Sequence, residues 1–285
     1  ADSAMYAAKA GGRNSYHFFT PGLDAAMRRR HIIVRDMREA LQRGEFSLLY
    51  QPQVDMASTR IVSAEALLRW STRDHAVPPD EFIPVAEESG LMLPLGQWVL
   101  REACRQLRAW RDNGYADLRI CINLSLCQVL QAGFAAGLID TLRETGLHPS
   151  DLHLEITEGT LMQPGAENLV CLKHLSQSGV RLTVDHFGSG HCNLTGLQRV
   201  PLHTLKIDQS FVHGIGSQHE DMAVIDVIIA MARSMRLEVV AEGVETGEQA
   251  SFLRAHGCTT AQGYYFGKPV SADQFTGYLR RQGAS

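Results

Sequence analysis

The sequence predicts an α/β protein, a single (β/α)8 barrel of the TIM type with a connecting helix before it. Eight short runs have the apolar, β-branched character of buried strands, and amphipathic stretches long enough for helices separate most of them. Each run also ends in, or carries, polar residues. The runs are 47–51, 61–69, 118–125, 152–157, 180–190, 204–208, 237–243 and 259–264. Because barrel active sites lie at the C-terminal ends of the strands, these polar residues should converge on one face.

The run 180–190 shows this pattern most clearly. Its apolar, β-branched part ends on the ionisable pair Asp185 and His186, and a glycine-rich turn follows. A buried strand of this kind delivers its last side chains to a functional loop. Asp185 is therefore the first candidate for a metal ligand.

Composition excludes several classes of protein. A chain of 285 residues that is 45% hydrophobic can bury a full core, whereas a formal charge of -4 argues against a sequence-independent nucleic-acid binder. No apolar run approaches the roughly 18 residues of a membrane span, and no signal segment opens the chain. The six cysteines contain no Cys-x-x-Cys pair, so we expect reduced thiols in a cytoplasmic protein that makes no membrane contact.

Two segments precede the barrel domain, which we place at 46–285. Residues 1–20 predict an alanine-rich helix stopped by Gly11 and Gly12, followed by a short strand, which is too little to fold alone. Residues 21–45 are charged and carry apolar side chains at a helical period, which predicts the connecting helix. Because the chain begins at Ala1 rather than at a methionine, we expect it to be a piece of a longer protein.

Four of the strand-end residues suit a metal ion. If Glu65, Asn123, Glu155 and Asp185 meet at the barrel mouth, three carboxylates and an amide oxygen come together. They would repel one another unless a hard cation lay between them, and oxygen ligands favour Mg²⁺ or Mn²⁺. The alternative for any single carboxylate is a solvated strand end or a helix cap.

Other strand-end residues suit work on a phosphate or a nucleotide base. Lys206 either neutralises the carboxylates or holds an attacking water or a phosphate oxygen. Glu242 is a candidate to orient that water or to act as general base. Arg69 suits a planar phosphate or a guanine edge, and Gln51 and Gln262 offer both donor and acceptor to a base.

Dispersed motifs over 46–279 resemble the EAL family of cyclic di-GMP phosphodiesterases. They are YQP at 50–52, AEALLRW at 64–70, FIPVAEESG at 82–90, INLS at 122–125, LEITE at 154–158, LKIDQSFV at 205–212, AEGVET at 241–246 and AQGYYFGKP at 261–269. Residues 1–20 resemble the end of a GGDEF-type diguanylate cyclase domain. The resemblance implies hydrolysis of one phosphodiester bond of cyclic di-GMP to give the linear dinucleotide, a homodimer, and GGDEF-type and sensor domains upstream.

The resemblance also implies a role for individual residues. The family's metal ligands fall on Glu65, Asn123, Glu155 and Asp185. Its water-positioning lysine and the glutamate of its AEGVE motif fall on the two residues singled out above, Lys206 and Glu242. Two further glutamates, which anchor loops in the family, fall on Glu158 and Glu245.

The chain departs from the family where DDFG is expected, because His186 replaces the second aspartate. Histidine is a poor ligand for Mg²⁺ but can bind Mn²⁺. His186 is thus a working ligand, a neutral spacer in a slow enzyme, or the mark of a domain that binds cyclic di-GMP without turnover. The loop 190–194 is altered as well, and its His191 and Cys192 raise the weaker possibility of a separate soft-metal site. Beside a hydrolase and a receptor without turnover, the third functional class is a plain interaction domain with an empty barrel mouth.

Overall fold

The computed structural model describes residues 21–72, 75–162, 166–188, 194–197, 199–216 and 219–283. Their contacts group into two compact units, one of residues up to 47 together with 69–95, and one of residues 48–68 together with 96–285. The helix and strand predicted in 1–20 lie outside the described residues. So do residues 189–193, and with them His191 and Cys192 of the proposed soft-metal site.

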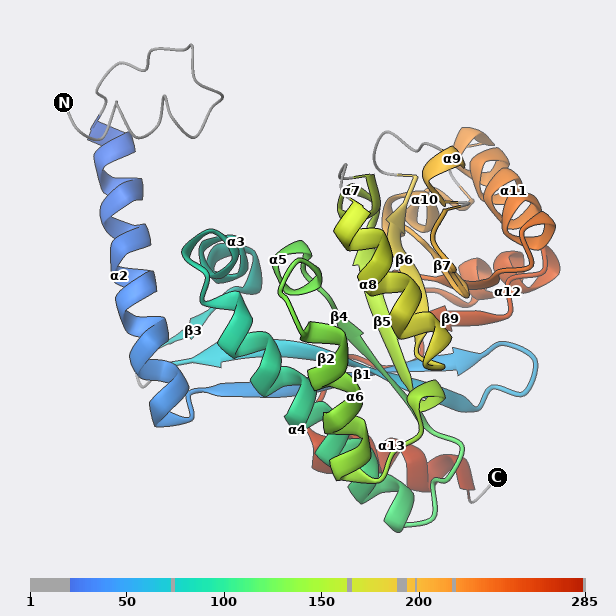
Figure 1. The fold of residues 1–285 in the computed structure, drawn as a ribbon. Helices are drawn as coiled ribbons and strands as arrows, with labels where there is room; N and C mark the ends of the chain where they lie inside the picture. The colour runs from blue at the N-terminus through green and yellow to red at the C-terminus, as the bar shows by residue number, and fades with distance from the viewer. Residues whose placement is uncertain are drawn as a thin grey trace. The chain divides into compact units, whose positions relative to one another are not determined.

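The predicted barrel is confirmed as a ring of eight strands (Figure 1). They are β1 (Phe46–Asp55), β2 (Ile61–Ser71), β4 (Arg119–Asn123), β5 (Leu152–Thr157), β6 (Arg181–Phe187), β7 (Thr204–Ile207), β8 (Glu238–Ala241) and β9 (Thr260–Gln262). Hydrogen-bonded neighbours follow the order β1-β9-β8-β7-β6-β5-β4-β2, and a pairing of β1 with β2 closes the ring. The ends of the parallel strands therefore meet on one side of the ring.

The first strand departs from the predicted repeat of strand and helix. β1 runs antiparallel to β9, with Gln53 opposite Gln262, whereas β2 and β4 to β9 pair in parallel. A tight turn joins β1 to β2, in which the Asp55 amide donates to the Arg60 carbonyl at 2.8 Å. Such a turn is too short for the crossover helix that a parallel connection needs. The helices expected between most of the strands are therefore replaced by a turn between β1 and β2.

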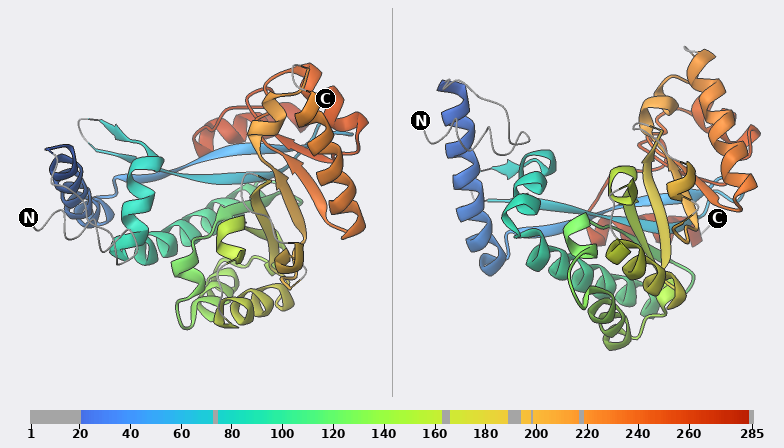
Figure 2. Two further views of the ribbon diagram at one scale, coloured as in Figure 1. Left: turned by 90° about the horizontal axis from the view of Figure 1, so that it is seen from above. Right: turned by 45° about the horizontal axis from the view of Figure 1, so that its top comes forward.

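Helices alternate with the strands from β4 onwards. They are α5 (Leu126–Val129), α6 (Phe134–Thr145), α7 (Glu158–Met162), α8 (Ala166–Gln177), α9 (Leu194–Leu197), α10 (Gln209–His213), α11 (His219–Ser234), α12 (Gly247–Ala255) and α13 (Ala272–Gly283), with α4 (Met92–Asp112) before β4 and a 3-10 turn at Pro149–Asp151. α8 packs on β6, and α11 packs on β7 and β8 (Figure 2). The helices thus cover the outer face of the strands.

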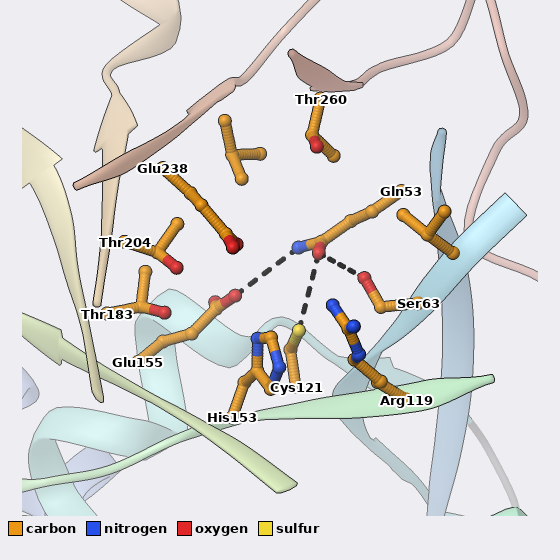
Figure 3. A pocket seen from close by; sticks show the side chains of 12 residues that line it. Gln53, Ser63, Arg119, Cys121, His153, Glu155, Thr183, Thr204, Glu238 and Thr260 are labelled. Atoms are coloured by element: carbon orange, nitrogen blue, oxygen red, sulfur yellow. Dashed lines mark hydrogen bonds between the residues drawn. The ribbon is translucent and has the colours of Figure 1, made fainter. Parts of the chain in front are cut away.

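Alternating side chains explain which face is covered. Along β5, Leu152, Leu154 and Ile156 are buried apolar residues, while His153 and Glu155 line the barrel interior (Figure 3). Successive side chains of a strand point to opposite faces, so a single sequence supplies both an outer apolar layer and an inner polar one. The outer apolar residues of β6 to β8 form one core with α11.

The smaller unit contains α2 (Pro21–Arg43), β3 (Ala76–Val77) and α3 (Pro79–Ser89). α2 corresponds to the helix predicted over 21–45, and it contacts α3, where Arg29 Nε donates to Glu81 Oε1 at 2.6 Å. Phe46 and Trp70 stack with their ring centroids 5.6 Å apart. The unit is therefore held by an apolar aromatic contact and by charge pairs along α2.

Five of the six cysteines lie in the described part, and all five are free thiols, of which Cys104, Cys121 and Cys258 are buried. Burial raises the pKa of Cys258 to about 12 and that of Cys104 to about 12 as well. These thiols are therefore protonated and unreactive at neutral pH. None of the helices that the structure describes has the length and apolar character of a membrane span.

Candidate active site at the strand ends

The parallel strands bring the predicted residues together through their register. Asn123 at the end of β4 lies opposite Glu155 of β5, and Asp185 of β6 lies opposite Thr157. Lys206 lies on β7 and Glu242 directly follows β8. Because the strands are aligned in parallel, these side chains face the interior at nearly one level.

Lys206 lies at the centre of the cluster. Its side chain is 1% exposed, and its Nζ lies 2.7 Å from an oxygen of Glu155 and 2.7 Å from one of Glu242. Oxygens of Glu65 and Asp185 follow at 3.3 Å and 3.4 Å. One ammonium group therefore contacts four carboxylates. Both roles expected of Lys206, to neutralise the carboxylates or to hold a water or phosphate oxygen, stay predictions.

Amide side chains complete the cluster. Asn123 Nδ2 donates to Glu65 Oε1 at 2.9 Å, and Gln262 Nε2 donates to Glu65 Oε2 at 2.6 Å. Gln262 Nε2 also donates to Gln51 Oε1 at 2.9 Å, and Gln51 donates in turn to the Gly267 carbonyl at 3.2 Å. Both oxygens of Glu65 are thus occupied by donors within the chain, and the two glutamines expected to read a base are bound to the acid cluster or beside it.

Burial and mutual repulsion set the protonation of the cluster. Burial by itself would lower the pKa of Lys206, but Glu155, Glu242 and the other carboxylates outweigh it and hold the pKa well above its usual value. Burial, aided by Asp185 and Glu65, raises the pKa of Glu242 to about 7. One cation cannot balance four buried carboxylates, so a carboxyl of this cluster takes up a proton more readily than it would in water.

His186 extends the cluster on its open side. Its backbone has φ 54°, in the left-handed region, at an irregularity in the β6–β7 register. The ring Nδ1 lies 2.8 Å from Asp208 Oδ2, and Nε2 lies 3.5 Å from Asp185 Oδ2. Burial would lower the pKa of His186, but Asp185, Asp208 and Glu242 outweigh it and raise the pKa. The half-exposed ring therefore bridges acidic groups from three strand ends.

Three residues of this group offer atoms to a single cation. One ligand atom each from Asp185, His186 and Glu242 lie within 4.8 Å of one another. The set consists of two carboxylates and an imidazole, and Lys206 links its carboxylates to Glu65 and Glu155. Such a donor set suits a divalent ion that accepts both oxygen and nitrogen.

Three predicted residues remain, and they differ in whether the structure connects them to the cluster. Glu158 is buried, and its Oε2 accepts a bond from the Gly188 amide at 3.4 Å, which ties it to the turn after β6. Glu245 is 52% exposed and 3.9 Å from His213, so the structure does not bring it to the cluster. Arg69 lies four residues beyond Glu65 on β2, half-buried and in the smaller unit.

Sequence reasoning gave no role to two residues that contact the cluster. Asp208 caps α10 by accepting from the Ser210 amide at 2.9 Å, while its other oxygen holds His186. Gln53 Nε2 lies 2.9 Å from Gln262 Oε1. The sequence could have indicated both residues, because alternate side chains of a strand point to the same face. Asp208 follows Lys206 by two positions, and Gln53 follows Gln51 by two.

The fold and the strand-end cluster together define the class of protein. It is a (β/α) barrel with an acidic cluster around one lysine, which is a candidate metal site for hydrolysis. The chain belongs to the EAL family, since the family model described as the EAL domain matches residues 34–269.

Curated relatives agree with this assignment. The bifunctional diguanylate cyclase/cyclic di-GMP phosphodiesterase MucR of Pseudomonas aeruginosa is 42% identical over 275 residues, 96% of this chain and 40% of that protein. The cyclic di-GMP phosphodiesterase PdeR of Escherichia coli is 35% identical over 282 residues, 99% of this chain and 42% of that protein. The chain thus spans less than half the length of either relative.

Solved structures share the fold. The PaMucR phosphodiesterase in its c-di-GMP complex has a TM-score of 0.81 and 41% identity, over 85% of this chain and 99% of that one. The EAL enzyme Bd1971 in its cAMP-bound form has a TM-score of 0.85 and 34% identity, over 90% of this chain and 72% of that one.

Proposed function

We propose that this chain binds cyclic di-GMP and hydrolyses one of its phosphodiester bonds, releasing the linear dinucleotide, with a divalent metal ion as cofactor. The observation that carries this proposal is the contact of Lys206 with four carboxylates at the strand ends. A receptor for the nucleotide alone has no physical need for such a set. Relatives named cyclic di-GMP phosphodiesterases support the choice of substrate.

The charge of the cluster fits a divalent ion. Four carboxylates face one ammonium group, so negative charge is in excess, and Asp185, His186 and Glu242 converge on one point. Asp185 and His186 would hold the ion together with Glu65, Asn123 and Glu155, and Glu242 would lie beside it. Mg²⁺ or Mn²⁺ is the expected ion, and the imidazole favours Mn²⁺. When bound, it lowers the pKa of a water and neutralises charge on the phosphoryl oxygens.

The chain's own residues divide the remaining work. Lys206 fixes the carboxylate oxygens in place and presents positive charge toward the phosphate. Glu242, bound to Lys206 through one oxygen, is the candidate to orient the attacking water and accept its proton at the other. Gln51 and Gln262 remain proposed contacts to the nucleotide, although both also hold the cluster together. The role of Arg69 toward a phosphate or a guanine edge stays a prediction.

Chromatographic detection of the linear dinucleotide tests the proposal. The protein is incubated with cyclic di-GMP and Mn²⁺, beside the Glu65→Ala variant. We expect product from the unaltered protein and a loss of at least about 100-fold in the variant, because Glu65 supplies an oxygen to the cluster. Absence of product in a sample that binds the nucleotide contradicts hydrolysis.

A receptor without turnover is the second candidate, and His186 is the observation that favours it. Its ring is bound to Asp208 at 2.8 Å, and where the family pattern has a carboxylate it brings no negative charge when neutral. Calorimetry of cyclic di-GMP binding in chelator separates the two functions. Equal affinity with and without metal, together with no turnover, identifies a receptor. The homodimer and the upstream GGDEF-type and sensor domains stay predictions.

A further inference from the structure

Gln53 occupies an unusual place inside the barrel. It lies on β1, the antiparallel strand, and is 3% exposed. Figure 3 shows its carboxamide pointing across the interior toward Glu155, with Ser63 and Cys121 on its other side. Gln53 thus connects the base of the barrel to the acid cluster.

Each polar atom of the Gln53 carboxamide has two partners. Its Nε2 donates to Gln262 Oε1 at 2.9 Å and makes a longer contact of 3.4 Å with Glu155 Oε1. Its Oε1 accepts from Ser63 Oγ at 2.5 Å and from Cys121 Sγ at 3.3 Å. These partners fix the orientation of the amide, because the reverse orientation would turn Oε1 toward two other oxygens.

The orientation of Gln53 is passed on to Glu65 through Gln262. Gln262 Oε1 accepts from Gln53, which leaves its Nε2 to donate to Glu65 at 2.6 Å. One glutamine therefore contacts Glu155 directly and Glu65 through a single intermediate. Both carboxylates also contact Lys206.

Hydrogen bonds rather than packing hold Gln53 in this orientation. A polar cavity of about 30 Å³ adjoins it, lined among others by His153 and Thr204. Within the described residues, His153 Nε2 and Thr204 Oγ1 are buried and lack a hydrogen-bond partner, so the cavity is not filled by a close-packed apolar layer. The bonds from Ser63 and Cys121 therefore hold the Gln53 carboxamide turned toward the cluster.

We propose that Gln53 is a positioning residue of the hydrolytic site, which orients Glu65 and Glu155 from inside the barrel and is itself held by Ser63 and Cys121. This inference rests on the proposed function for its effect on turnover. Its effect on metal binding is independent of turnover, since residues that orient metal ligands alter metal affinity by themselves.

Gln53→Met tests the proposal, because methionine keeps the length of the side chain and removes its hydrogen bonds. We expect Mn²⁺ affinity, measured by calorimetry without nucleotide, to fall about tenfold. The kcat should fall by a similar factor of about ten, with KM for cyclic di-GMP changed less than about twofold. Thr141→Val is the matched control, since it also removes a buried hydrogen bond but lies on α6.

Ser63→Ala is a second, milder variant, which keeps glutamine at position 53 but removes one of the bonds that hold it. It should lower Mn²⁺ affinity by about threefold, and it should add nothing in the Gln53→Met background, because both changes act through one chain of bonds. A folded Gln53→Met protein with unchanged Mn²⁺ affinity overturns the proposal. If Gln53→Met does not fold, unchanged affinity in Ser63→Ala overturns it instead. If the unaltered protein binds cyclic di-GMP without turnover, the Mn²⁺ titrations of the unaltered protein and its variants still test the role of Gln53.

Discussion

The two ends of the barrel interior carry opposite kinds of charge on the same strands. The C-terminal strand ends gather acids around Lys206. The N-terminal ends carry Arg119, Arg181 and His153, with Glu238 paired to Arg181 at 2.7 Å. Burial together with the two arginines lowers the pKa of His153 to about 3, so its ring is neutral at any ordinary pH.

The difference in exposure decides which charges matter for stability. At the C-terminal ends Lys206 and Glu155 are each 1% exposed, whereas Glu238 at the base is 54% exposed. A buried ion pair that loses one partner leaves an uncompensated charge, while an exposed pair is screened by water. The acidic end should therefore be sensitive to single substitutions, and the basic end should tolerate them.

The largest expected effect is that of Lys206→Met, which removes the ammonium group that contacts four carboxylates. We expect the free energy of unfolding to fall by about 3–5 kcal/mol and turnover to be lost. Urea denaturation at pH 7.5 measures the first effect, and product chromatography measures the second.

Added Mn²⁺ sharpens this test. A divalent ion should restore part of the stability of Lys206→Met, because it supplies positive charge among the same carboxylates. A variant as stable as the unaltered protein in chelator would falsify the view that Lys206 holds the acidic end together.

The next effect concerns His186 at the edge of the acidic cluster. If its ring is a metal ligand, the ratio of activity with Mn²⁺ to activity with Mg²⁺ should fall severalfold in His186→Asp, because a carboxylate oxygen suits Mg²⁺ better than an imidazole does. Parallel rate measurements with the two metals give the ratio. An identical ratio in both proteins removes His186 from the coordination of the ion.

A smaller effect is expected from pH at the basic end. The Leu182 amide donates to His203 Nδ1 at 3.1 Å, and burial together with Arg181 lowers the pKa of His203 below its ordinary value. The unfolded chain then takes up a proton at a higher pH than the native one, so this contribution to stability is present above about pH 6.5 and is lost as the pH falls below it.

His203→Asn isolates that contribution, because an amide oxygen can accept the Leu182 bond and does not titrate. Its unfolding free energy should decline less between pH 7.5 and pH 5.5 than that of the unaltered protein. The difference should stay below the roughly 1.4 kcal/mol per pH unit that one group can contribute, because solvent screens the partly exposed ring. Equal declines in the two proteins would show that His203 does not titrate on unfolding.

The smallest effect should be that of Glu238→Gln at the base. It breaks the pair with Arg181, but the carboxylate is half-exposed, so a loss below about 1 kcal/mol is expected. A loss as large as that of Lys206→Met would remove the contrast between the two ends.

Strand alternation made the barrel and most of its site predictable from the sequence. The apolar runs and their polar ends sufficed to place Glu65, Asn123, Glu155 and Asp185 on one side of a parallel sheet, and the register brings the last three together. These features depend only on a period of two and on parallel pairing.

Features that depend on a turn or on a particular partner could not be predicted in the same way. The reversal after β1 follows from the tight turn at Asp55 to Arg60, which resembles any other loop in the sequence. The bonds of Gln53 and Asp208 depend on which side chains stand opposite them in the ring. The position of Lys206 among four carboxylates likewise required the distances themselves.

Lys206 also separates the folding of the protein from the binding of a metal ion. A chain that relied on an outside ion to hold its acids together would fold only where that ion was abundant, as small zinc domains do. Here Lys206, which lies on β7, supplies the opposing positive charge from within the polypeptide. The acidic end therefore has an opposing charge as soon as the chain folds, whether or not an ion is present.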